Sequence, residues 1–238
     1  MERKKAVVLL SGGLDSSTVL AYAVSLGYEV HAISFDYGQR HSREMNSSEE
    51  IARYYGVDRK IVRVDLRAIG KSALTDDIDV PSRDLESIPE EIPVTYVPAR
   101  NTIFLSIAAA YAESIGSTDI FIGANAIDYS GYPDCRPEYF NAMEKALTLG
   151  TEIGLRKGMH INVPLQYLTK ADIIRMGLKL GVPYEKTWSC YRGGQRACGE
   201  CDSCLLRLKG FMEAGSEDPL EYEKYPAFYK EYVEKRKK

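Results

Sequence analysis

A cluster of hydroxyls, glycines and one carboxylate lies near the start of the chain, in the segment Ser11-Gly12-Gly13-Leu14-Asp15-Ser16-Ser17. Glycine lets backbone N–H groups approach an anion closely, and a helix start adds unpaired donors and the positive end of a dipole. Serine hydroxyls supply further hydrogen-bond donors. Such a segment suits the binding of phosphate groups, and the Asp15 carboxylate could help to organise a magnesium ion.

The residues on either side of this segment predict how it is positioned. The apolar run 6–10 is typical of a buried strand, and apolar residues recur at helical spacing from 19 to 26, before Gly27. The segment therefore lies where a strand turns into a helix, although a plain tight turn would give the same pattern. Neither a Walker A sequence nor G-x-G-x-x-G is present. The sequence S-G-G-x-D-S instead resembles the pyrophosphate loop of the ATP pyrophosphatases, which split ATP between its α and β phosphates.

The order of the expected elements indicates the fold class. Strands are predicted over 29–37 and 60–66, with a polar helix over 40–55 between them. This alternation is typical of a doubly wound, mainly parallel α/β sheet of Rossmann-like type, in which ligands bind at the carboxyl ends of the strands. Phe35, near the end of the second strand, is therefore placed to meet an adenine or ribose, and packing at the strand end would explain it equally well.

Composition and charge argue against some classes of protein. The chain has 238 residues, 45% of them hydrophobic, and a formal net charge of −3. A weakly acidic balance argues against a protein that binds along a nucleic-acid backbone. No apolar stretch is long enough to span a membrane, and the run before Ser11 is too short for a signal-peptide core. We therefore expect a cytoplasmic protein, whose cysteines are reduced or bound to metal.

Two further segments carry side chains suited to ligand binding. Arg100 precedes an apolar helix, expected to be capped by Asn101 or Thr102, and its guanidinium could contact ATP phosphates or lie on the surface. The loop 125–138 follows a strand predicted over 118–123, at the same edge of the sheet. Its amide, carboxylate, guanidinium and phenol groups suit a flat heterocycle with several hydrogen-bonding edges, although ordinary turns have similar composition. The residues expected to bind this substrate are Asn125, Asp128, Tyr132, Asp134 and Arg136.

Four cysteines near the C-terminus form a second motif, Cys190-x7-Cys198-x2-Cys201-x2-Cys204. Four thiolates at this spacing can close a tetrahedral zinc site, but C-x2-C-x2-C is also the spacing of iron–sulfur ligands. The spacing alone leaves both metals open. Cys135 lies outside the motif, and we expect it to be a partly buried thiol.

Residues 68–98 interrupt the alternation of strands and helices with a mixture of acidic residues and prolines. A loop of this length inside a compact domain is usually functional or disordered. The segment could therefore be a mobile lid over the active site or a plain disordered insertion.

Motifs along nearly the whole chain resemble those of the 7-cyano-7-deazaguanine synthases of the queuosine and archaeosine pathways. They are S-G-G-L-D-S-S at 11–17, F-D-Y-G-Q-R-H at 35–41, Y-V-P-A-R-N at 96–101, G-Y-P-D-C-R-P-E at 131–138 and the cysteine spacing at 190–204. The resemblance implies a ligase that uses ATP, magnesium and ammonia to convert 7-carboxy-7-deazaguanine into its nitrile. The reaction passes through an adenylated acid and an adenylated amide.

The resemblance also implies roles for particular residues. It implies zinc rather than a cluster at Cys190, Cys198, Cys201 and Cys204, and catalytic roles for Asp15, Ser16 and Arg100. The residues expected at ATP are Leu10, Ser11, Gly12, Gly13, Leu14, Asp15, Ser16, Ser17 and Phe35.

The expected organisation is an α/β domain of ATP pyrophosphatase type over 1–185, with a zinc-binding, helical segment over 186–238 packed on it. No direct contact with nucleic acid or membrane is expected. The chain could form a homodimer, but the sequence does not give the oligomeric state. Two alternatives belong to other classes. One is an enzyme of the same superfamily that thiolates or amidates a tRNA base, and the other is a nucleotide-binding regulator without catalysis.

Overall fold

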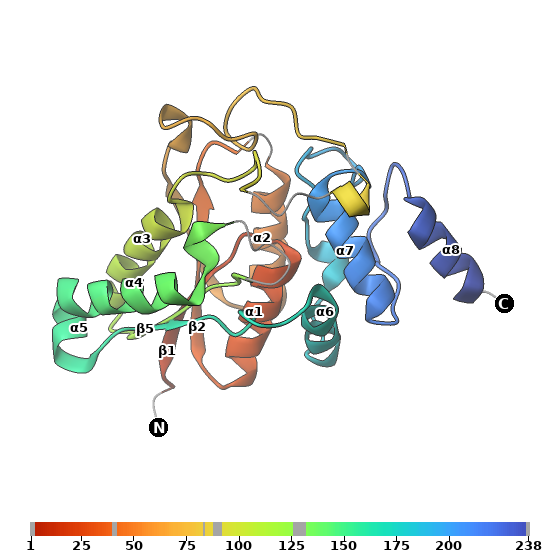
Figure 1. Ribbon diagram of the computed structural model, residues 1–238. Coiled ribbons are helices and arrows are strands. Elements are labelled where there is room, and N and C mark those ends of the chain that lie inside the picture. The colour runs from red at the N-terminus through yellow and green to blue at the C-terminus, as the bar shows by residue number, and fades with distance from the viewer. Residues whose placement is uncertain (1–2, 40–41, 83, 88–91, 126–131, 237–238) are drawn as a thin grey trace.

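A parallel sheet forms the centre of the computed structural model (Figure 1), which describes residues 3–236 except 40–41, 83, 88–91 and 126–131. Its strands have the order β3-β2-β1-β4-β5, and every neighbouring pair is parallel. The strands are β1 (Lys5–Leu9), β2 (Glu29–Asp36), β3 (Asp58–Arg63), β4 (Asp119–Phe121) and β5 (His160–Asn162). The doubly wound, parallel α/β fold expected from the sequence is therefore confirmed.

Helices connect the strands and cover both faces of the sheet (Figure 1). The α-helices are α1 (Leu14–Ser25), α2 (Arg43–Tyr55), α3 (Arg100–Ser114), α4 (Pro137–Gly150), α5 (Glu152–Lys157), α6 (Lys170–Lys179), α7 (Asp202–Glu213) and α8 (Ala227–Arg236). Short 3₁₀ helices cover Leu66–Ala68, Leu85–Ser87, Pro133–Cys135 and Tyr184–Lys186. Within the described ranges, no helix is both long enough and apolar enough to cross a lipid bilayer.

Alternation along β1 divides the hydrophobic core into two clusters. Val7 and Leu9 face one side and pack with residues of α3 and α4, such as Leu105. Val8 faces the other side, in a cluster that includes α1, α2, α6 and α7. Because successive side chains of a strand point to opposite faces, β1 is buried on both sides, as its continuous apolar sequence predicts.

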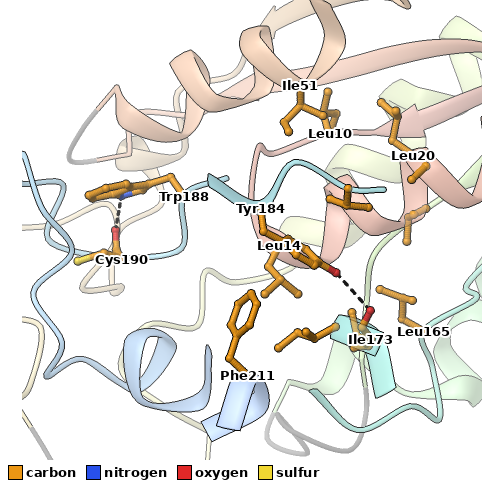
Figure 2. Packing of buried hydrophobic residues seen from close by; sticks show 14 of the residues in the cluster. Leu10, Leu14, Leu20, Ile51, Leu165, Ile173, Tyr184, Trp188, Cys190 and Phe211 are labelled. Carbon is orange, nitrogen blue, oxygen red and sulfur yellow. Dashed lines mark hydrogen bonds between the residues drawn. The ribbon is translucent and has the colours of Figure 1, made fainter. Parts of the chain in front are cut away.

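The C-terminal segment shares the second of these clusters with the helices of the α/β unit. Figure 2 shows Leu10, Leu14 and Ile51 in the same cluster as Trp188 and Phe211. A Cβ atom on Gly210 of α7 would lie 2.4 Å from Cγ of Lys170 on α6, so glycine at this position lets the two helices approach closely. The four-cysteine region is thereby held against the α/β unit.

The third strand differs from its predicted range of 60–66, because β3 covers Asp58–Arg63. A 3₁₀ helix begins at Leu66, and the Asp65 carboxylate accepts a hydrogen bond from the backbone N–H of Arg67 at its start. An aspartate that caps a helical turn competes with strand extension. The alternation of apolar and polar residues therefore continues past Arg63, where the strand ends, and this explains why the predicted strand ends too late.

Candidate active site

A pocket of about 280 Å³ opens at the carboxyl edge of the sheet, where the loops after β1 and β4 meet. The strand order reverses between β1 and β4, since the chain proceeds outward to β3 on one side and to β5 on the other. Ligands of doubly wound sheets bind in the crevice at such a switch point. A Cβ on Gly123, two residues after the end of β4, would lie 3.0 Å from the backbone nitrogen of Ser16. The two loops are therefore in close contact.

The segment 11–16 forms one wall of the pocket at the start of α1. The hydroxyls of Ser11 and Ser16 lie 3.0 Å apart, and the Ser16 hydroxyl donates to the carbonyl of Gly13 at 3.2 Å. The backbone N–H of Gly13 donates to the Ser11 hydroxyl at 3.2 Å. Hydroxyls and N–H groups are thus gathered at a helix N-terminus, which is an arrangement that suits an anion.

Gly12 allows α2 to approach this loop. Its φ is +85°, and a Cβ there would lie 2.4 Å from the backbone nitrogen of Ser48 and 2.5 Å from the carbonyl oxygen of Glu44. The first half of α2 is therefore pressed against the loop in a way that only glycine permits. Gly12 itself does not line the pocket.

Ser17 also lies away from the pocket. Its side chain is fully buried, and its hydroxyl has no hydrogen-bond partner among the described residues. Its backbone N–H donates to the carbonyl of Gly13 in the first turn of α1. The structure therefore brings Leu10, Ser11, Gly13, Leu14, Asp15, Ser16 and Phe35 of the residues expected at ATP to the pocket, but not Gly12 or Ser17.

Lys170, at the start of α6, reaches across the pocket to the first turn of α1. Its ammonium donates to both carboxylate oxygens of Asp15, at 2.8 and 2.9 Å, and its side chain is only 12% exposed. This lysine was not predicted from the sequence. A signal was present, because Thr169 caps the helix and a positive charge in the first turn opposes the helix dipole. Lys170 is therefore not explained by the stability of its own helix.

Aromatic and charged side chains line the other end of the pocket. The rings of Phe35 and Phe104 are stacked, with centroids 4.0 Å apart and an interplanar angle of 2°. Tyr37 and Arg100 lie beside them. Burial raises the pKa of Tyr37 to about 12, although Arg100 opposes this shift. Burial disfavours the charge of Arg100, but electrostatic interactions with surrounding groups, Tyr37 and Tyr132 foremost, leave its pKa raised, so the guanidinium stays charged.

The start of α3 differs from the prediction. The helix begins at Arg100, with Ala99 in the left-handed region at φ 53°, so neither Asn101 nor Thr102 is its N-cap and that expectation is wrong. Asp134 provides the missing acceptor, because its carboxylate accepts a hydrogen bond from the backbone N–H of Asn101 at 3.0 Å. A contact with a residue 33 positions away replaces the local cap.

The residues expected to bind the substrate are placed differently from one another. Asn125 and Tyr132 line the pocket. Asp134 is buried beneath the start of α3, and Arg136 is exposed, with its Nε donating to the carbonyl of Pro133. Neither of these two lines the pocket. Asp128 lies outside the described residues.

The four cysteines of the second motif come together in a buried cluster. The sulfur atoms of Cys190, Cys198, Cys201 and Cys204 all lie within 4.8 Å of one another. Those of Cys198 and Cys204 are 3.9 Å apart. Four thiolates at Zn–S bonds of about 2.3 Å form a tetrahedron with edges of about 3.8 Å. The donor set therefore fits one metal ion, whereas a cluster would place several iron and sulfide atoms between the thiolates.

Trp188 connects this cysteine cluster to the loop at the start of α1. Its backbone N–H donates to the carbonyl of Gly12 at 2.9 Å, and its indole N–H donates to the carbonyl of Cys190 at 2.9 Å (Figure 2). The guanidinium of Arg43 on α2 lies 4.4 Å from the centre of the indole ring. One residue therefore joins a cysteine of the cluster, the loop at the start of α1, and α2.

Arg207 of α7 lines the pocket from the C-terminal segment and was also not singled out from the sequence. Its side chain is 2% exposed and donates from Nε to the Asp218 carboxylate at 2.7 Å. It also donates to the hydroxyl of Thr187 at 2.7 Å, next to Trp188. The ion pair between Arg207 and Asp218 is thus buried, and Arg207 connects it to Thr187, which precedes the pocket residue Trp188.

Comparisons with known proteins agree with this arrangement. A family model described as queuosine biosynthesis protein QueC matches residues 5–215. A 7-cyano-7-deazaguanine synthase of Thermoplasma acidophilum is 95% identical over 238 residues, covering 100% of both chains. One of Thermoplasma volcanium is 78% identical over 226 residues, covering 95% of this chain and 94% of the relative.

A solved structure, an NMN synthetase from Francisella tularensis, has a TM-score of 0.50 and 17% identity. The similarity covers 97% of this chain and 82% of that chain, and at this identity it shows a shared fold alone. The family match spans most of the chain, including the loop at the start of α1 and the cysteine cluster. The chain therefore belongs to the family of the queuosine biosynthesis protein QueC.

Proposed function

We propose that this chain converts 7-carboxy-7-deazaguanine, ammonia and ATP into 7-cyano-7-deazaguanine in the cytoplasm, as an ATP-dependent ligase that forms carbon–nitrogen bonds. The name of a relative that is 95% identical over the whole chain supports this reaction. The observation that carries it is one pocket containing both the hydroxyl-rich helix start with Lys170 and an aromatic end with Arg100. High-identity relatives bear the synthase name, so the alternative of tRNA-base thiolation is not favoured.

ATP would lie with its β and γ phosphates at the start of α1. Ser11 and Ser16 supply hydroxyls, Gly13 supplies a backbone N–H, and Lys170 supplies a positive charge. In this assignment Lys170 moves from Asp15 to the phosphates, and Asp15 is released to help organise magnesium. Preorganised donors of this kind stabilise the charge that develops on the leaving pyrophosphate.

The aromatic end of the pocket would hold the deazaguanine. Its flat ring suits the space beside Phe104, and Asn125 and Tyr132 offer polar groups to its edges. Phe35, which stacks on Phe104, keeps the role expected from the sequence at the adenine or ribose of ATP. The charged Arg100 would hold the substrate carboxylate toward the α-phosphate of ATP. A carboxylate is a poor electrophile, and adenylation of its oxygen turns AMP into the leaving group for attack by ammonia.

We assign zinc to the four-cysteine cluster, in a structural role. The ion would hold Cys190 and therefore Trp188, which donates to the carbonyl of Gly12 in the anion-binding loop. The domain division at residue 185 expected from the sequence stays a proposal, and so does a homodimer. Leu74, from the segment 68–98, lines the pocket, which supports a covering role for that segment.

Incubation of the purified protein with ATP, magnesium, ammonium and 7-carboxy-7-deazaguanine tests the proposal, with mass spectrometry of the products. We expect the nitrile, with AMP and pyrophosphate formed in two equivalents for each nitrile. Binding of ATP without release of AMP would favour the nucleotide-binding regulator instead. Iron and labile sulfide in the purified protein would contradict the zinc assignment.

Replacing Lys170 by Met is expected to reduce kcat by on the order of 10²- to 10³-fold, as the loss of one preorganised donor does in other active sites. Methionine keeps the length of the stem that packs against Gly210 but removes the charge that reaches Asp15. Steady-state pyrophosphate release measures the effect, and the melting temperature checks the fold.

Lys179 provides the matched control, because it is an exposed lysine in the last turn of the same helix. Lys179→Met should retain turnover close to that of the unsubstituted protein. Unchanged kcat in Lys170→Met would show that this lysine serves only the structure around Asp15.

A further inference from the structure

Glu44 lies in the first turn of α2 and lines the pocket. The contact at Gly12 fixes its backbone, since a Cβ on that glycine would lie 2.5 Å from the Glu44 carbonyl oxygen. Its side chain interacts electrostatically with Arg100 and Tyr37, which belong to the aromatic end of the pocket. Glu44 is therefore attached to the phosphate end of the pocket by its backbone, while its carboxylate faces the other end.

Among the described residues that line the pocket, Asp15 and Glu44 are the two with a carboxylate side chain. Asp15 is occupied by the two hydrogen bonds from Lys170. No described residue donates a hydrogen bond to the carboxylate of Glu44. Arg207, a further charged residue in the lining, is paired with Asp218. As far as the described residues show, the Glu44 oxygens are thus available to a bound molecule.

The proposed reaction releases protons that must be removed where the aromatic end of the pocket holds the substrate. Ammonia adds its lone pair to the acyl carbon of the adenylated acid, and the adduct loses one proton from nitrogen and AMP from carbon to give the amide. The amide oxygen then displaces pyrophosphate from a second ATP. The resulting nitrogen carries two hydrogens, and both leave as protons while the C–O bond to AMP breaks with its electron pair to form the nitrile.

We propose that the carboxylate of Glu44 is the catalytic base that accepts these protons from nitrogen. This inference rests on the proposed function and names a residue for a step that the other lining groups do not serve. Arg100, which faces Glu44, holds a positive charge and cannot accept a proton. Lys170 is engaged with Asp15 and in the proposed assignment with phosphate. Glu44 keeps partial exposure toward the pocket, so it can release each proton to water.

The protein environment raises the pKa of the Glu44 carboxylate toward neutral pH, as a catalytic base requires. Desolvation by burial raises the pKa of Glu44 to about 7, although the charge of Arg100 acts to lower it. A base with a pKa near the working pH combines adequate strength with a large deprotonated fraction. Burial raises the pKa of Tyr37 to about 12, that of Cys135 to about 11, and that of Tyr132 above its usual value. These groups stay protonated at neutral pH.

The substitution Glu44→Gln tests the inference, because it keeps the size of the side chain and removes its basicity. Exchange of labelled pyrophosphate into ATP with the carboxylated substrate, and without ammonium, reports adenylation of the acid, which needs no base. We expect this exchange to be unchanged, whereas nitrile formation with ammonium falls by on the order of 10²-fold, the contribution of a positioned base. At a fixed concentration of free ammonia, the wild-type rate should rise with pH through about 7, and Glu44→Gln should lose this dependence.

Two further variants make the result specific. Glu44→Asp keeps a carboxylate on a shorter stem and should recover part of the rate together with the pH dependence. Glu50→Gln changes an exposed carboxylate on the same helix and should behave like the wild type. If Glu44→Gln folds poorly, the dependence of the Glu44→Asp rate on pH tests the inference instead.

The outcomes separate the two proposals. If the wild type shows no pyrophosphate exchange, the proposed function fails. If exchange is retained and Glu44→Gln forms the nitrile at the wild-type rate, the base assignment alone is overturned. Loss of pyrophosphate exchange in Glu44→Gln would also overturn it, because Glu44 would then serve adenylation.

Discussion

Replacement of Cys201 by Ser is expected to lower bound zinc to well below one ion per chain and to unfold the region around the cysteine cluster. The four sulfurs lie within 4.8 Å of one another, and each cysteine is at most 4% exposed. Structural zinc held by thiolates contributes on the order of 10 kcal/mol to the folding of its local unit. Loss of one thiolate leaves three ligands and a buried hydroxyl that binds zinc weakly.

The expected loss of structure should extend from the cluster to the active site. Cys190 is joined to Trp188, and Trp188 donates to the carbonyl of Gly12 in the loop at the start of α1. We therefore expect faster proteolysis between residues 188 and 204, followed by loss of ATP turnover. Elemental analysis and limited proteolysis with mass spectrometry measure the two effects.

Cys135→Ser is the matched control, since Cys135 is also buried but lies outside the cluster and receives a hydrogen bond from the side-chain amide of Asn101. Its zinc content should stay at one ion per chain. A full complement of zinc in Cys201→Ser, or its loss in Cys135→Ser, would show that the ligands are assigned wrongly.

The parts of the site that could be predicted from the sequence are those defined within a short segment. The loop at the start of α1 places its hydroxyls and N–H groups within six residues, and the strand and helix beside it are predicted by local periodicity. The cysteine cluster is likewise defined by spacing between residues 190 and 204. In both cases chain connectivity alone brings the groups together.

The residues that were missed belong to the pocket through tertiary packing. Lys170 meets Asp15 across 155 positions of sequence, and Glu44 faces Arg100 from a different helix. In the sequence, Glu44 is one of several charged residues in a polar helix, and nothing separates it from its exposed neighbours Glu49 and Glu50. Only the close approach of α2 to Gly12 places it at the pocket.

Asp134 has a structural role in the fold that its residue type did not predict. A carboxylate in a polar loop at the edge of the sheet was expected to contact the substrate. In the structure it is 7% exposed and accepts the hydrogen bond from the backbone N–H of Asn101, so it supports the start of the helix that carries Arg100. A helix start with Ala99 as its N-cap needs an external acceptor, and the sequence does not reveal where that acceptor comes from.

Asp218→Asn is expected to lower the free energy of unfolding by roughly 3–5 kcal/mol, the usual cost of removing one partner of a buried ion pair. Arg207 and Asp218 have side chains that are 2% and 0% exposed, and the carboxylate accepts from Nε at 2.7 Å and from a terminal guanidinium nitrogen at 2.9 Å. The hydroxyl of Tyr222 also donates to this carboxylate, at 2.6 Å. Asparagine keeps the shape but leaves the buried guanidinium without a compensating charge.

The neighbouring Glu217 provides a control for the effect of burial, because its ion pair is exposed. Its carboxylate is 51% exposed and lies 3.9 Å from Arg236, so Glu217→Gln should change stability by less than about 1 kcal/mol. Urea unfolding of both variants, with zinc held constant, measures the difference. Because Arg207 also contacts Thr187 beside the pocket wall, Asp218→Asn should raise KM for ATP even under conditions where the chain stays folded. If Asp218→Asn lowers the free energy of unfolding as little as Glu217→Gln does, the Arg207 guanidinium finds water or another acceptor. The ion pair then does not hold the C-terminal segment against the active site.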